Sequence, residues 1–295
     1  MSIIQFKEAN CKNCYKCIRS CPVSAIAFRN DQAEIIHDEC TFCGNCLKIC
    51  PQNAKSVSSE LDKVKKFIKK KEKVYVSLAP SFISAFDYDE KWLYCALKKL
   101  GFTHIEGTAN GAYQVSRQYE KLLNKREMKN IITSCCSSII LLIEKHYPQL
   151  LGQLAPVVSP MIAHAKMLRE TYGQRIRVVF IGPCVAKKTE AKLPVLKDAV
   201  DCVLTFEELA AIFEAYKLEP EKIEVKMPLN DASHHGRIYA HTGGVSTAIA
   251  ASIKNLNPNL EVKIRRGNGI KECRQILDAI EEGKLEANFV EGMAC

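Results

Sequence analysis

The feature that most constrains this chain is a cysteine spacing that occurs twice near the N-terminus. Both copies read C-x-x-C-x-x-C-x-x-x-C-P, and together they contain eight of the fifteen cysteines. In iron–sulfur proteins with this run, the first three thiolates bind one [4Fe–4S] cluster and the cysteine before proline binds the other cluster. The spacing therefore predicts two [4Fe–4S] clusters with these ligands: Cys11, Cys14, Cys17 and Cys50 for the first, and Cys40, Cys43, Cys46 and Cys21 for the second.

Zinc is the alternative metal, because paired C-x-x-C motifs also build tetrahedral zinc sites. Two complete copies that both keep the proline favour iron–sulfur clusters. The repeat resembles bacterial two-cluster ferredoxins and covers residues 1–58. Short β-like stretches alternate with cysteine loops and brief helical turns, which predicts an α+β ferredoxin-like module of βαββαβ order. The expected strands are 2–6, 25–29, 33–37 and 54–58.

Composition narrows the class of protein. The chain has 47% hydrophobic and 25% charged residues, which is typical of soluble globular proteins. It has no apolar run long enough to span a bilayer and no signal-peptide pattern at its start, so we expect a cytoplasmic location and no membrane span. The clustered cysteines then indicate metal binding in a reducing cytosol, as in an anaerobe, instead of disulfides.

The formal net charge of +9 raises the question of nucleic-acid binding. Two [4Fe–4S] clusters with four thiolates each would contribute about −2 apiece and lower this charge to roughly +5. The positive excess is concentrated in the lysine-rich segment 63–73, within a charged connector over 59–73. We interpret the connector as a linker helix with a solvated basic face, and docking of an acidic electron carrier is the alternative. We expect no nucleic-acid partner.

Residues 74–295 have a different pattern, in which apolar strand-like runs alternate with helical ones. This alternation predicts an α/β domain with largely parallel sheets. The expected strands are 74–78, 131–133, 176–181, 200–204 and 288–290. The expected helices are 83–100, 110–125, 138–147, 159–172, 206–217, 245–254 and 270–282. In such domains, sites lie in the loops just beyond the carboxyl ends of the strands.

Three strand ends in this domain carry cysteines. They carry, in order, the pair Cys135 and Cys136, then Cys184, then Cys295. We expect these three ends to lie at the edge of one sheet, where their thiols would suit a buried metal cluster. The remaining cysteines lie inside helix or strand patterns, and we interpret them as small buried hydrophobic residues: Cys95, Cys202 and Cys273.

The loops around these strand ends resemble the three signature loops of [FeFe]-hydrogenases, which read approximately TSCCP, MPCxxKKxE and ExMACxxGC. The counterparts are Thr133–Ser137, Gly182–Glu190 and Glu291–Cys295, in the same order. Weaker similarities lie at 78–81, 159–160 and 242–245. The resemblance spans residues 74–295 and implies an [FeFe]-hydrogenase-like fold after the ferredoxin module.

The resemblance also implies roles for matching residues. It implies a third [4Fe–4S] cluster, which in the family adjoins a two-iron subsite, with these ligands: Cys136, Cys184 and Cys295. Cys135 would relay protons, Glu190 would lie on the proton path, and Lys187 would hydrogen-bond a cyanide ligand of the subsite. A thiol with a lowered pKa and a carboxyl with a raised pKa can exchange protons near neutral pH. The alternative for Lys187 and Glu190 is a solvated first helical turn.

The sequence departs from the family pattern at neighbouring positions. Ser137, Gly182 and Met161 stand where the family usually has Pro, Met and Gln. Such neighbours tune rate and potential more than they abolish cluster binding. The family's fourth cysteine lies four positions beyond the counterpart of Cys295, outside this sequence. We therefore expect residues 74–295 to be a C-terminally truncated fragment, in which a diiron subsite depends on residues beyond Cys295.

These features favour an [FeFe]-hydrogenase-type oxidoreductase that interconverts H2 with protons and electrons, using the ferredoxin clusters as an electron relay. The expected partners are a redox protein such as a ferredoxin and, for a diiron site, hydrogenase maturation proteins. The alternative is a non-catalytic hydrogenase-like protein that senses redox state or H2, transfers electrons or serves assembly. A plain ferredoxin with an unrelated domain would not explain three ordered loops. We interpret the remaining histidine candidates as loop or surface residues: His234, His235 and His241.

Overall fold

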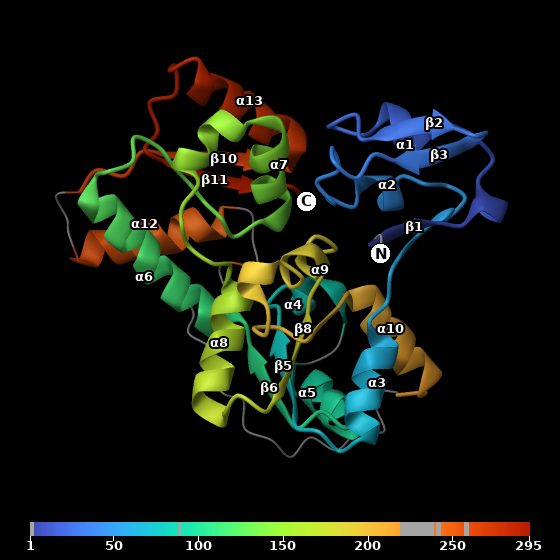
Figure 1. The fold of residues 1–295 in the computed structure, drawn as a ribbon. Coiled ribbons are helices and arrows are strands. Elements are labelled where there is room, and N and C mark those ends of the chain that lie inside the picture. The colour runs from blue at the N-terminus through green and yellow to red at the C-terminus, as the bar shows by residue number, and fades with distance from the viewer. Residues whose placement is uncertain (1–2, 88–89, 219–238, 240–242, 257–259) are drawn as a thin grey trace.

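The structure is a computed structural model of the chain, and it describes residues 3–87, 90–218, 239, 243–256 and 260–295. The three histidine candidates lie outside these described residues. A small cysteine-rich module is followed by a larger α/β domain built on two parallel sheets (Figure 1). Within the described ranges, no helix is both long enough and apolar enough to cross a membrane.

The module has the predicted βαββαβ order. Its elements are β1 (Ile4–Phe6), η1 (Glu8–Asn10), α1 (Lys16–Arg19), β2 (Ile26–Arg29), β3 (Gln32–Ile35), α2 (Asn45–Lys48) and β4 (Lys55–Val57). β1 pairs antiparallel with β4, and β2 pairs antiparallel with β3. In each cysteine loop, the residue before the second cysteine has a left-handed backbone, with φ of 52° at Asn13 and 53° at Phe42. The repeat in the sequence is therefore also a repeat in conformation.

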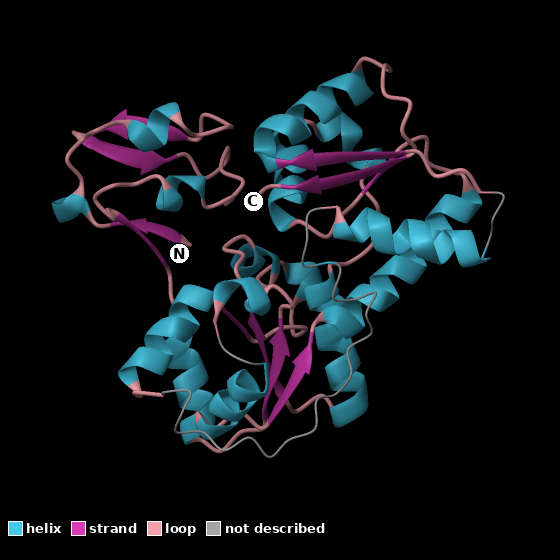
Figure 2. Cartoon of the chain, turned by 180° about the vertical axis from the view of Figure 1, so that it is seen from behind, coloured by secondary structure: helices cyan, strands magenta, loops and turns pink. Residues whose placement is uncertain are grey.

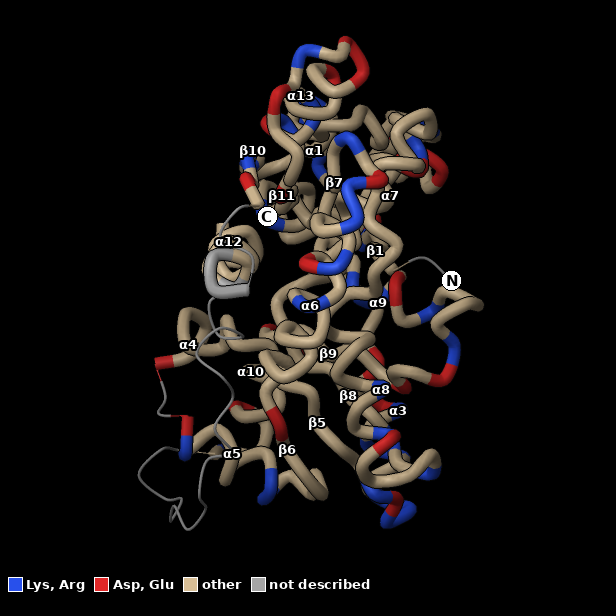
Figure 3. The backbone as a smooth tube through the Cα atoms, turned by 90° about the vertical axis from the view of Figure 1, so that its left-hand side faces the viewer, with Lys and Arg blue, Asp and Glu red and all other residues tan. Residues whose placement is uncertain are grey.

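A linker helix, α3 (Leu61–Lys69), occupies the charged connector as predicted. Val64 and Phe67 of this helix are buried in the core of the following domain, whereas its lysines are exposed. Figure 3 shows α3 at the opposite end of the molecule from β10 and β11. The basic segment is therefore a solvated helix face, as interpreted from the sequence.

The first sheet of the second domain has four parallel strands in the order β6-β5-β8-β9. The strands are β5 (Val74–Leu78), β6 (His104–Gly107), β8 (Arg177–Ile181) and β9 (Cys202–Leu204). The helices and turns around it are α4 (Phe82–Ala85), α5 (Glu90–Lys99), α8 (Pro160–Tyr172), α9 (Lys187–Glu190), η3 (Pro194–Leu196) and α10 (Phe206–Ala215). Figure 1 shows α8 on one side of the sheet and α5 with α10 on the other, which explains why every residue of β5 is buried.

The second sheet has three parallel strands in the order β10-β11-β7 (Figure 2). The strands are β7 (Ile131–Ile132), β10 (Ile264–Asn268) and β11 (Phe289–Met293). The helices and turn around it are α6 (Ala109–Lys125), α7 (Ser137–His146), η2 (Pro148–Gln153), α12 (Gly244–Leu256) and α13 (Gly269–Glu281). The expectation of one sheet edge for all the strand-end cysteines is therefore wrong. The strand before Cys184 belongs to the four-stranded sheet, whereas those before Cys136 and Cys295 belong to the three-stranded sheet.

Two strands, β6 and β10, were not predicted from the sequence, and the helix predicted over 83–100 is divided into two. β6 and β10 are edge strands with polar sequences, HIEG and IRRGN, which show little of the apolar signal that marks a central strand. The helix expected over 83–100 is two helices, α4 and α5, because the backbone is extended at Phe86, with φ −132° and ψ 133°.

The chain passes between the two sheets along α6 and α8, which lie side by side. Their closest approach is at Gly111, where an added Cβ would lie 2.3 Å from the carbonyl oxygen of Pro160. A residue with a side chain would therefore force the two helices apart.

Candidate metal centres

The eight cysteines of the module surround two cavities. One cavity, here called the outer site, is lined by Cys11, Cys14, Cys17 and Cys50. The other cavity, the inner site, is lined by Cys21, Cys40, Cys43 and Cys46. The structure thus groups three cysteines of one run with the last cysteine of the other run, which is the grouping that the spacing predicts.

Backbone amides support sulfur atoms in both sites. The amide of Ala25 donates to Cys21 Sγ at 3.2 Å, and the amide of Ala54, its counterpart in the repeat, donates to Cys50 Sγ at 3.4 Å. Burial raises the pKa of Cys46 to about 12, so this thiol loses its proton only when a bound cation replaces it. The donors therefore suit a metal centre.

The choice between zinc and iron–sulfur clusters rests on the spacing of the two runs. Among the described residues, no group of three or more His, Cys, Asp or Glu side chains is arranged to hold a single metal ion. The two complete copies with their prolines favour [4Fe–4S] clusters, in which each thiolate binds a different iron.

A third group of cysteines, here called the third site, consists of Cys136, Cys184 and Cys295. Cys136 is the N-cap of α7, Cys184 lies between β8 and α9, and Cys295 follows β11. Cys136 packs in one cluster with Val185, the residue after Cys184, and with Ala294, the residue before Cys295. Burial raises the pKa of Cys184 to about 12. The structure therefore brings the segments of the three cysteines that the family resemblance selected into one part of the fold, although they come from two sheets.

The inner site is the neighbour of the third site. Cys295 is exposed, although its sulfur is partly shielded from water, which raises its pKa; Cys136 and Cys43 of the inner site add to this effect. Gly44, the residue after Cys43, faces the Val185 side chain that follows Cys184. The two candidate centres therefore face one another across the boundary between the module and the second domain.

The side chains of Lys187 and Glu190 form a buried ion pair next to the third site. Lys187 Nζ donates to Glu190 Oε2 at 2.6 Å and to the carbonyl oxygen of Cys135 at 3.0 Å. Ser137 Oγ donates to the same Glu190 oxygen at 2.6 Å. Glu190 is only 4% exposed and Lys187 is 9% exposed, so the alternative of a solvated helical turn is wrong. Burial lowers the pKa of Lys187, but Glu190 and Cys184 reverse this effect and raise it, so Lys187 remains an ammonium.

The Cys135 thiol lies against a buried phenol that the sequence analysis missed. Tyr119 OH is 3.5 Å from Cys135 Sγ and 3.1 Å from Ser134 Oγ, and it accepts a hydrogen bond from the Ser134 amide at 2.8 Å. The buried position of the sulfur raises the pKa of Cys135 to about 12, whereas the sequence analysis expected a lowered pKa. A tyrosine inside the helical pattern of 110–125 gave no signal of this contact, because its partner comes from a different part of the chain.

Glu291 fixes the loop that carries Cys295. Its carboxylate accepts hydrogen bonds from the amides of Gly243 at 3.1 Å, Val245 at 3.4 Å and Ser246 at 2.8 Å, at the start of α12. A carboxylate at a helix N-terminus is stabilised by the unpaired amides and by the helix dipole. The sequence analysis placed Glu291 in a signature loop but assigned it no role.

The departures from the family pattern have physical explanations here. Ser137 supplies a hydroxyl to Glu190, which proline could not do. A Cβ at Gly182 would lie 2.7 Å from the ring of Phe180, so glycine is needed. Met161 is 1% exposed in the core around the four-stranded sheet. Of the remaining cysteines, Cys202 and Cys273 are buried as predicted, whereas Cys95 is only half-buried.

Comparison with known proteins agrees with this arrangement. Residues 72–295 match the family described as iron only hydrogenase large subunit, C-terminal domain, and residues 3–51 match a 4Fe-4S dicluster domain. Iron hydrogenase 1 of Clostridium pasteurianum is 30% identical, over 90% of this chain and 55% of that protein. The periplasmic [Fe] hydrogenase large subunit of Nitratidesulfovibrio vulgaris is 29% identical, over 100% of this chain and 84% of that protein. The chain thus spans about half the length of the first of these relatives.

Two further similarities bear on function and fold. A cytosolic Fe-S cluster assembly factor of Vanderwaltozyma polyspora is 27% identical over 50% of this chain and 27% of that protein. An [FeFe]-hydrogenase structure from Chlamydomonas reinhardtii aligns with a TM-score of 0.63 at 19% identity, covering 81% of this chain and 82% of that one. The structural likeness shows a shared fold.

Proposed function

The chain belongs to the iron-only hydrogenase large-subunit family, and from this premise we propose that it serves an oxidoreductase that interconverts H2 with protons and electrons. In this proposal the outer and inner sites bind [4Fe–4S] clusters and relay electrons to a third [4Fe–4S] cluster on Cys136, Cys184 and Cys295. A redox protein such as a ferredoxin would exchange electrons with the module in the cytoplasm. Maturation proteins would be needed for a diiron subsite.

The observation that carries this proposal is the buried polar cluster beside the third site. A buried ion pair is weak evidence for stability, because its desolvation penalty offsets its Coulombic gain. Charged groups that are buried together in this way are concentrated at functional sites. Lys187 and Glu190 join the backbone of Cys135 to the loop that carries Cys184. This location beside the third site supports a role for the pair in proton transfer or in binding an anionic ligand.

The residues of the second domain have separable parts in such a reaction. Bound clusters would supply one-electron storage, and a two-iron subsite would supply the chemistry of H2. The Cys135 thiol holds a proton, because its pKa is raised to about 12, and Tyr119 fixes its position. The Lys187 ammonium can stabilise an anionic ligand. The Ser137 hydroxyl and Lys187 both orient the Glu190 carboxylate.

The test is infrared spectroscopy of protein matured anaerobically, with the gene extended past residue 295 wherever the natural sequence continues. Bound CO and CN− absorb where protein is silent, so we expect their bands together with H2 turnover. Cys135→Ala should keep the bands and lower turnover by less than about 100-fold, because a pKa raised to about 12 makes this thiol a poorer general acid than one whose pKa lies near the working pH. Cys95→Ala, at a half-buried cysteine outside the three sites, is the matched control. Absence of the bands in the extended protein would rule out the proposal.

A non-catalytic function in redox sensing, H2 sensing or cluster assembly is the second candidate. The similarity to an assembly factor and the exchanges at Ser137 and Met161 favour it. Redox sensing and cluster assembly require clusters at the cysteine sites but no CO or CN− bands, whereas H2 sensing would show the bands without appreciable turnover. With this function, Cys135→Ala should leave the redox response or the cluster assembly of the protein unchanged. This difference separates the two candidates.

A further inference from the structure

Lys145 holds the cysteine loop of the inner site from the second domain. It lies in the last turn of α7, the helix that is capped by Cys136. Its Nζ donates to the carbonyl oxygens of Cys40 at 2.7 Å and His37 at 2.8 Å, and it lies 5.6 Å from the centre of the Phe42 ring. The Lys145 side chain is half-buried, although lysine is usually exposed. One ammonium therefore ties down the loop over residues 37–42.

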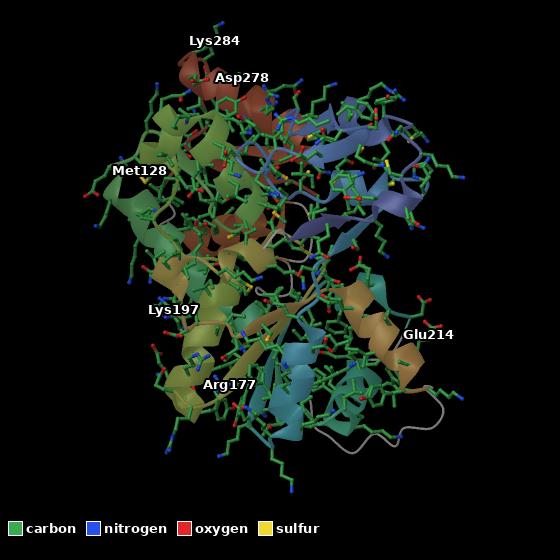
Figure 4. All side chains as sticks on the ribbon, turned by 45° about the vertical axis from the view of Figure 1, so that its right-hand side comes forward. Met128, Arg177, Lys197, Glu214, Asp278 and Lys284 are labelled. Carbon is green, nitrogen blue, oxygen red and sulfur yellow. The ribbon has the colours of Figure 1, made fainter. Side chains whose placement is uncertain are left out.

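A second cation holds the other ligand loop of the same site. Arg274 of α13 donates from Nη1 to the carbonyl oxygen of Pro22, the residue after Cys21, at 2.9 Å. Its Nε also donates to Tyr147 OH at 3.3 Å, and Tyr147 OH donates in turn to Asp278 at 2.8 Å. Figure 4 labels Asp278 on α13, whose first turn lies on the side of the module in Figure 1. Both ligand loops of the inner site thus contact cations of the second domain.

The outer site has no such contact with the second domain. Its cation belongs to the module itself, since Arg19 donates to the carbonyl oxygen of Cys14 at 3.2 Å, and in the described part of the chain no lysine or arginine of the second domain hydrogen-bonds its cysteine loops. A positive charge beside an iron–sulfur cluster favours the reduced, more negative state and raises the reduction potential. A half-buried charge keeps this influence, because water and salt screen it less than an exposed one. Lys145 should therefore raise the potential of the inner cluster more than that of the outer cluster.

We propose that Lys145 is a positioning residue for electron transfer, which fixes the inner-site loop against α7 and raises the reduction potential of the cluster bound there. Electrons entering the module then collect on the centre that faces the third site. The inference rests on cluster binding by the module, and it holds whether or not the third site turns over H2.

The test is a redox titration of the anaerobically reconstituted chain, followed by electron paramagnetic resonance of the two module clusters. Lys145→Met removes the charge and the donors but keeps an unbranched side chain, and Lys145→Arg restores charge and donors. Lys48→Met is the matched control, because Lys48 is an exposed lysine of α2 between Cys46 and Cys50. Hydrogen exchange of the amides over 37–43 is measured in parallel.

We expect Lys145→Met to shift the reduction equilibrium of the inner cluster about tenfold toward the oxidised state, which is 59 mV for a one-electron couple. The outer cluster and the Lys48→Met variant should stay unchanged, exchange over 37–43 should accelerate, and Lys145→Arg should recover most of the shift. An unchanged inner potential overturns the proposal, even if exchange accelerates. An equal shift of both clusters, or an equal shift in Lys48→Met, also overturns it, because either would reflect net charge alone. Absence of H2 turnover in the unaltered chain would count only against the proposed function.

Discussion

The module and the second domain gather their cysteines in opposite ways. Each site of the module takes three cysteines from a single short loop and a fourth from its repeat. The third site takes its cysteines from three loops at the ends of strands in two different sheets. The module sites therefore depend on local spacing, whereas the third site depends on the packing of the whole second domain. A substitution that disturbs this packing should therefore weaken metal binding at the third site before it affects the two sites of the module.

The largest expected effect follows from removing a cysteine of the third site. In the protein matured with its two-iron subsite, Cys184→Ala should lower the iron content from about fourteen to about eight atoms per chain, because the third [4Fe–4S] cluster and the subsite beside it are both lost. H2 turnover should be abolished, while the resonance signals of the module clusters stay. Iron analysis and paramagnetic resonance measure this, with Cys202→Ala as the control at a buried cysteine of β9. Simultaneous loss of the module clusters would contradict the independence of the two regions.

The next largest effect is expected when the buried ion pair between Lys187 and Glu190 is broken. Lys187→Met leaves the Glu190 carboxylate buried without its cation, and breaking a buried pair in this way costs about 3–5 kcal/mol. We expect this loss in the free energy of unfolding, measured by urea titration followed by circular dichroism. The double variant Lys187→Met with Glu190→Met should recover most of the loss, because it leaves no buried charge. A single variant within about 1 kcal/mol of the parent would show that Glu190 is solvated.

Acid should weaken the second domain through Glu106 of β6. Hydrogen bonds from His164, Tyr172 and His104 hold the pKa of this carboxyl at about 2. The folded pKa lies below the unfolded value, so the stabilisation is present above about pH 4.3 and is lost as the pH falls toward 2. Glu106→Gln should lower the free energy of unfolding by about 3 kcal/mol at pH 7 and by progressively less toward pH 3. Urea titrations across this range check it, with the exposed Glu281→Gln as control; a difference that is independent of pH would refute the charge-based explanation.

The smallest effect concerns the neighbour of Cys135. Tyr119→Phe removes the acceptor of the Ser134 amide and the contact with Cys135, and loss of one neutral hydrogen bond costs about 1–2 kcal/mol. Turnover should fall several-fold, since the Cys135 thiol would no longer be fixed. Thermal unfolding and an H2 evolution assay measure these changes, with the exposed Tyr113→Phe as control. If the Tyr119→Phe variant evolved H2 at the parent rate, Tyr119 would have no role in the site.

Local features of this protein could be predicted from the sequence, because the information lies within a few residues. The module order, the grouping of Cys50 with the first run and the helix of the charged connector all follow from spacing or periodicity. The second sheet could not be separated from the first in this way, since β7 has only two residues and β10 is polar. The partners of Tyr119 and Glu291 were also invisible, because their contacts join segments far apart in the chain. The signature loops pointed to cysteines that the structure places after strands of the two sheets, but the side chains around them follow only from the folded chain.

The close approach of α6 and α8 at Gly111 has a consequence for how the third site is made. These two helices carry the chain from one sheet to the other and back, and they meet where an added Cβ would lie 2.3 Å from a backbone oxygen. A side chain at position 111 would therefore push these helices apart and shift the two sheets relative to one another. Cys184 follows a strand of one sheet and Cys136 follows a strand of the other, so their spacing depends on this contact. A bulkier residue at position 111 would thus disturb the third site without contacting any of its cysteines.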